Sequence, residues 1–109
     1  MKLKPMCVGN WRIKSMDQWD MDFVDMLEQG HFTIRKDGTG SFQFGAVQGE
    51  MDFRVVQFDG VAKTLFSWMG FDEDTEASGM GWVEVKGKDM TGWIQFHEGD
   101  DSGFSAVKK

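Results

Sequence analysis

The chain has 109 residues, and 18 acidic against 12 basic side chains give it a net charge of −6. With 40% hydrophobic and 28% charged residues, the composition is that of a globular protein and excludes both a disordered chain and a membrane-spanning one. The length suits a single domain over residues 1–109, large enough to bury a core without disulfides or metal ions.

Charge and cysteine usage bear on partners and compartment. Phosphate binding needs clustered Lys and Arg, whereas the basic residues here stand mostly singly, so we expect no nucleic acid partner. The composition likewise predicts no membrane partner. The lone Cys7 excludes an intrachain disulfide, and no apolar segment follows the basic residues at the start. We therefore predict a cytoplasmic protein.

In the first 30 residues the spacing of apolar residues changes once, from a strand period to a helical one. Residues 6–13 alternate as a strand does, with Trp11 on the apolar face. Residues 15–30 then follow a helical period, with Ser15 and Gln18 as a capping box and Gly30 after the last turn. The apolar stripe of this predicted amphipathic helix consists of Met16, Trp19, Phe23, Met26 and Leu27.

After Gly30 the chain alternates in short runs that end at turn signals, among them Asp37-Gly38 and Asp59-Gly60. The predicted strands cover residues 31–36, 41–47, 50–58, 61–69, 81–86, 90–97 and 103–107. Within residues 50–58 the apolar positions change face at Val56, which indicates a β-bulge. Gly-aromatic pairs recur every 11 residues from Gly70-Phe71 to Gly103-Phe104, which fits a meander of similar arms or a coincidence.

Eight strands with one helix after the first predict an all-β fold, an eight-stranded antiparallel up-and-down barrel that hides both sheet edges. A strongly bent sheet or a sandwich fits the same pattern.

Gly9-Asn10-Trp11 on the first strand, followed by a helix and a meander, resembles the lipocalin-like (calycin) barrels. The resemblance implies that the Trp11 indole closes one end of the barrel beneath a basic residue of the last strand, here Lys108 or Lys109. Such a contact would be a cation–π interaction. The chain has no Tyr for the family's second motif, and small bacterial proteinase inhibitors use short eight-stranded barrels of similar size.

The aromatic residues form the largest group of candidate site residues. Interior candidates for binding a small apolar ligand are Trp11, Phe42, Phe44, Phe53, Phe66 and Trp68. In a barrel with strands this short, the same side chains would instead fill the interior completely. The first function we consider is therefore a small non-enzymatic ligand-binding barrel, which requires an open cavity.

The same alternation leaves Trp82, Trp93 and Leu65 on the outer face of neighbouring strands. Either the predicted helix covers this face or a second subunit does, in an isologous homodimer. The second function we consider is thus a protein-interaction or inhibitor-like module, binding through this face or through acidic loops.

Residues for catalysis or metal binding are few. His31 and His97 are predicted at strand ends and exposed, and Cys7 is predicted inward as an inert thiol. The acidic runs at residues 72–76 and 97–101 do not follow the EF-hand spacing, so we interpret them as solvated loops. We expect no catalytic residues, no metal and no cofactor, although a Cys7–histidine pair in a cleft would indicate an enzyme.

Overall fold

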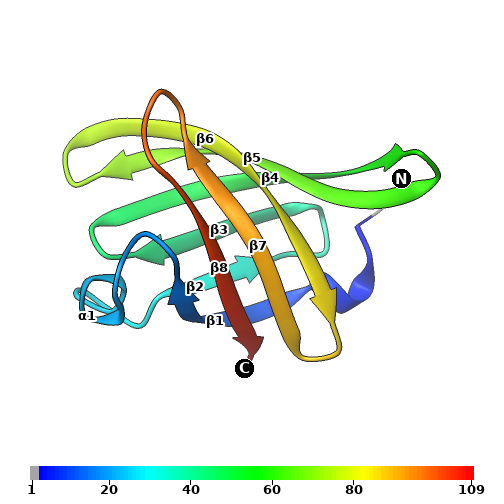
Figure 1. Ribbon diagram of the computed structural model, residues 1–109, viewed down its shortest axis with the longest axis horizontal. Coiled ribbons are helices and arrows are strands. Elements are labelled where there is room, and N and C mark those ends of the chain that lie inside the picture. Colours follow the sequence, from blue (N-terminus) through cyan, green and yellow to red (C-terminus); the bar gives the residue numbers. More distant parts are fainter. Residues whose placement is uncertain (1–2) are drawn as a thin grey trace.

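The computed structural model describes residues 3–109 and shows a closed barrel of eight antiparallel strands in sequence order (Figure 1). The last strand pairs with the first, so the predicted barrel is confirmed over the alternative of an open sheet. The elements are the 3-10 helix Pro5–Cys7, β1 Gly9–Met16, α1 Met21–Val24, β2 His31–Ile34, β3 Thr39–Phe44, β4 Val47–Phe58, β5 Val61–Asp72, β6 Thr75–Lys86, β7 Asp89–Phe96 and β8 Asp101–Lys108.

The two ends of the barrel differ. One end, here called the helix end, carries α1 and the connections β1–β2, β3–β4, β5–β6 and β7–β8. The other end, here called the arm end, carries the β2–β3 and β6–β7 turns and a long hairpin formed by the tips of β4 and β5. In Figure 1 this hairpin, the arm, projects to the right, while α1 lies at the left.

The helix predicted over residues 15–30 is wrong in length and position. Residues up to Met16 continue β1, because Ser15 pairs with Ser105 of β8 and their hydroxyls lie 2.7 Å apart. The β1–β8 register shifts between Ile13 and Ser15, which is a bulge that the sequence pattern did not reveal. Only α1 is helical, and its N-cap is Asp20, whose side chain accepts a hydrogen bond from the Phe23 amide.

The arm corrects the bulge predicted in residues 50–58. β4 pairs with β5 in an unbroken register as far as Phe58 opposite Val61. β3 pairs with β4 only as far as Asp52, and β6 pairs with β5 only as far as Thr64, so residues 56–63 project from the barrel as a two-stranded ribbon. Because neither face of the ribbon is fully covered, apolar residues such as Val56 occur on both faces without any bulge.

Glycines opposite aromatic rings explain how the barrel interior is filled. The cross-strand pairs are Phe42 with Gly49, Phe66 with Gly81, Trp68 with Gly79 and Phe104 with Gly92. A Cβ atom at Gly81 would meet the Phe66 ring, and one at Gly92 would meet the Phe104 ring. Each of these rings has a large side chain opposite it on one neighbouring strand and a glycine on the other, which leaves room for the ring in the small interior of an eight-stranded barrel.

The segment between β1 and β2 closes the helix end. Trp19 is partly buried, and its ring lies 5.3 Å from Phe44 and 5.9 Å from Phe96, measured between ring centroids. Arg12 holds this segment in place through an ion pair with Asp25 at 3.0 Å. Met26 and Leu27, predicted in the apolar stripe, are exposed instead.

Candidate functional site

The six interior candidates all lie inside the barrel and pack against one another. Each is at most 7% exposed, and Phe42 contacts both Phe44 and Trp68 with ring centroids 5.6 and 5.1 Å apart. Three hollows stand out among residues 3–109, and of the six candidates only Phe42 borders one of them. These three hollows therefore lie mainly outside the cluster of the six side chains.

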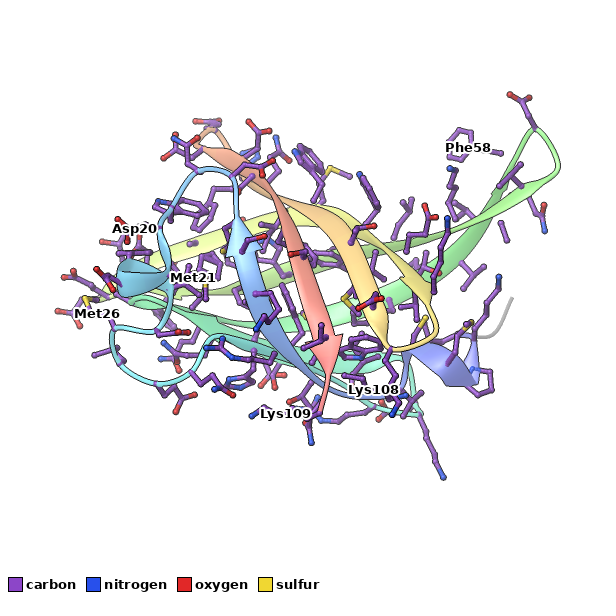
Figure 2. All side chains as sticks on the ribbon, turned by 60° about the horizontal axis from the view of Figure 1, so that its bottom comes forward. Asp20, Met21, Met26, Phe58, Lys108 and Lys109 are labelled. Atoms are coloured by element: carbon purple, nitrogen blue, oxygen red, sulfur yellow. The ribbon has the colours of Figure 1, made fainter. Side chains whose placement is uncertain are left out.

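Trp11 and Lys108 form the contact that the resemblance implied. The Lys108 Nζ atom lies 5.4 Å from the centroid of the buried Trp11 ring, and Lys108 is therefore the cation rather than Lys109. The indole Nε1 donates a hydrogen bond to the Cys7 carbonyl at 2.9 Å. This contact fixes the N-terminal 3-10 helix across the arm end (Figure 2).

A cleft opens at the arm end because β5 and β6 part. Their pairing stops at Thr64 opposite Val83, whereas β5 continues along β4 and β6 continues along β7. The cleft has a volume of about 690 Å³. Its lining is mostly apolar, with two lysines: Lys4, Met6, Cys7, Phe58, Val61, Ala62, Lys63, Thr64, Leu65, Trp82, Val83, Glu84 and Val85.

The predicted outer face exists and is larger than the sequence indicated. Leu65, Trp82 and Trp93 are direct neighbours across β5, β6 and β7. We define the β5–β7 face by ten uncharged outward positions around them, which lie between the charged outward residues at the strand ends: Leu65, Ser67, Met69, Phe71, Ser78, Met80, Trp82, Thr91, Trp93 and Gln95.

The β5–β7 face is exposed. Met69 is 69% exposed, Met80 is 50% exposed and Trp82 is 39% exposed. Trp93 is less exposed and its indole donates a hydrogen bond to the Asp101 carboxylate at 2.7 Å. α1 packs beside β1 at the helix end, so the chain's own helix does not cover this face. Of the two predicted ways to cover it, by the helix or by a second subunit, the first is therefore wrong.

The charged outward residues lie only at the edges of this face: Glu76 is opposite Phe71, and Glu84 is opposite Thr91. The outward positions of the neighbouring β4, in contrast, are Gln48, Glu50, Asp52 and Arg54. Absence of charge together with exposed Met and Trp distinguishes the cores of protein–protein interfaces from ordinary surface. The largest of the three hollows, of about 930 Å³, borders this face at Met69, Phe71 and Ser78.

The residues considered for catalysis are not brought together. Cys7 lies at the arm end, whereas His31 and His97 lie towards the helix end. Burial raises the pKa of the Cys7 thiol, against a smaller lowering by Lys4 and Lys108, so the thiol stays protonated and inert. His97 Nε2 lies 3.4 Å from the Glu98 carboxylate, but both side chains are largely exposed.

The acidic loops do not form a metal site in the part of the chain described. Within residues 3–109, no group of three or more His, Cys, Asp and Glu side chains is arranged to hold a metal ion.

Sequence reasoning missed the cleft and the arm. The signal was present in the change of face at Val56 and in the apolar Phe58 and Val61 beside the Asp59-Gly60 turn. Figure 2 shows Phe58 close to the arm tip, far from Asp20 and Met26 at the helix end.

Comparison with known proteins gives no relatives: the chain matches no family model, no curated protein and no solved structure. None of the helices in residues 3–109 is long and apolar enough to cross a membrane.

Proposed function

We propose that this protein is a non-enzymatic interaction module that binds a protein partner through the β5–β7 face. The observation that carries the proposal is the cluster of exposed Met69, Met80 and Trp82 on the neighbouring strands β5 and β6. Exposed apolar surface of this kind is costly to leave in water, and aromatic and Met side chains are enriched where partners bind.

The packed interior supports the same choice. A barrel filled by glycine–aromatic pairs offers its outer surface, and not its centre, for binding. The closed meander and the Trp11–Lys108 contact support a relationship to the lipocalin-like barrels in fold. The single, buried cysteine supports a cytoplasmic location.

Site-specific photo-cross-linking in the cells that produce the protein tests this function. Met80 is replaced by photoreactive benzoylphenylalanine, and Thr33, an outward residue of β2, is replaced in the same way as the control. We expect covalent protein adducts from position 80 and none from position 33. Absence of adducts at position 80 would contradict the proposal.

The cleft at the arm end supports a second candidate function, the binding of a small apolar molecule. Its volume of about 690 Å³ and apolar lining are typical of ligand sites, which commonly occupy about 300–1,000 Å³. Native mass spectrometry of freshly purified protein should then show a bound mass that is lost on denaturation. Val85→Trp, which fills the cleft, should remove that mass, while Thr33→Trp on the surface should not.

A further inference from the structure

We infer that the partner of the β5–β7 face is a second copy of this chain, packed face to face with its strands antiparallel to those of the first. The inference rests on the proposed function, because it names the partner of the same face. It is carried by the distribution of charge at the two ends of that face.

The helix end of the face is strongly acidic. Segments 72–76 and 97–101, which connect β5 to β6 and β7 to β8, hold seven carboxylates and no Lys or Arg. These carboxylates are Asp72, Glu73, Asp74, Glu76, Glu98, Asp100 and Asp101.

The arm end of the face carries most of the nearby positive charge. Lys63 lies on β5, Lys86 ends β6 and Lys88 lies in the turn that follows. Glu84 and Asp89 also lie at this end, and the Glu84 carboxylate is 3.7 Å from the Lys86 Nζ atom. Lys4 borders the adjoining cleft. The helix end therefore holds seven carboxylates without a Lys or Arg, whereas three lysines against two carboxylates give the arm end a net charge of +1, with an uncharged apolar region between the two ends.

Two copies can pack face to face with their strands either parallel or antiparallel, and the distribution of charge favours one of these two arrangements. A two-fold axis along the strands would bring the acidic ends of both copies together, seven carboxylates facing seven. An axis across the strands instead places each acidic end over the partner's Lys63, Lys86 and Lys88, with the apolar centres in contact. Like charges in close opposition disfavour the first packing, and complementary charges favour the second.

Zero-length carbodiimide cross-linking of the wild-type protein tests the arrangement directly. Glu76 and Lys86 lie on the same strand, β6, ten residues apart. In a strand this separation is about 33 Å, so no amide bond can form between them within one subunit. We expect cross-linked dimers whose peptides join acidic residues of segment 72–76 to Lys63, Lys86 or Lys88. Dimers cross-linked only through other surfaces would overturn the antiparallel arrangement.

Sedimentation velocity over a range of protein concentrations tests the dimer itself. We expect a concentration-dependent monomer–dimer equilibrium, weakened by salt because its flanking charge pairs are partly solvent-exposed. Met80→Glu should raise the dissociation constant at least tenfold. Leu27→Glu, which adds the same charge at an exposed apolar residue outside the face, should leave it within twofold.

The two proposals fail in distinguishable ways. A protein that is monomeric at all concentrations, yet forms adducts of other masses through position 80 in cells, would overturn the second copy and leave the interaction function standing. A monomer with no adducts at position 80 would overturn both. A dimer that Met80→Glu does not weaken would place the subunit contact elsewhere and overturn the inference.

Discussion

The inner and outer faces of β5–β7 use the same kinds of side chain under different constraints. Inside, Phe66 lies opposite Gly81; one position along on the outer face, Leu65 lies opposite Trp82, which in turn lies opposite Trp93. Phe66 lies between the Phe53 ring on β4 and Gly81 on β6, so the glycine leaves room on one side of the ring only. The outer rings face no such limit, so the intramolecular packing of the barrel does not account for them.

Removing an inner ring should have the largest effect on stability. Phe44 is fully buried, and its ring contacts Phe42 and Trp19. Phe44→Ala should lower the free energy of unfolding by about 4 kcal/mol, because it loses buried apolar surface and leaves a cavity. Phe58→Ala, the same substitution at the exposed arm tip, is the matched control and should cost less than about 1 kcal/mol. Urea unfolding followed by Trp fluorescence measures both, and equal losses would contradict the distinction between the faces.

Adding a methyl group inside the barrel should have the next largest effect on the free energy of unfolding. Gly81→Ala places a methyl group against the Phe66 ring and the Trp93 carbonyl, and should lower the free energy of unfolding by about 2 to 3 kcal/mol. Ser78→Ala, at an outward position of the same strand, should change it by less than about 0.5 kcal/mol. If Gly81→Ala proves neutral, the glycine is not what makes room for the ring.

The glycine–aromatic pairs also show how much of the packing could be predicted from the sequence. Alternation and the Asp-Gly turns were sufficient for the number and order of the strands and for the inward placement of Phe66 and Trp68, whereas β6 begins at Thr75 and not at the predicted residue 81. The 11-residue recurrence of glycines was visible too, but its meaning depends on register. Only paired strands show that Gly81 and Gly92 face rings, whereas Gly103 faces outward towards Asp17.

Long-range pairing explains the parts that were not predicted. The pattern over residues 15–30 favours a helix locally, yet Ser15 is held in β1 by Ser105, 90 positions away. The separation of charge along the β5–β7 face was equally hidden, because Lys63 and Lys86 are 23 positions apart in sequence and lie at the same end only because β5 and β6 pair antiparallel.

The segment that closes the interior at the helix end should show a pH dependence. A hydrogen bond from the Gly30 amide, together with the Arg12 guanidinium, lowers the pKa of Asp25 in the folded protein. A lowered folded-state pKa stabilises the fold above the unfolded carboxyl's pKa, and this stabilisation is lost as the pH falls through the folded value. Asp25→Asn should therefore cost about 1 kcal/mol at pH 7 and progressively less as the solution is acidified towards pH 3.

Urea titrations of the wild type and Asp25→Asn at several pH values measure this difference. Asp89→Asn removes an exposed carboxylate at the arm end and serves as the control. A cost for Asp25→Asn that stays constant down to pH 3 would assign the effect to the lost hydrogen bonds of the amide form, and not to the charge.

The smallest effect on the isolated subunit should come from the outer face. In dilute protein, Met80→Ser should change the free energy of unfolding by less than about 0.5 kcal/mol, since Met80 is already half exposed. At high concentration the wild type gains stability by mass action if two copies associate through this face, because only the folded chain binds. The thermal midpoint of the wild type should then rise with concentration while that of Met80→Ser stays nearly constant. A large loss in dilute Met80→Ser would instead mean that this face is part of the subunit's own packing, and the contrast between the inner and outer faces would not hold.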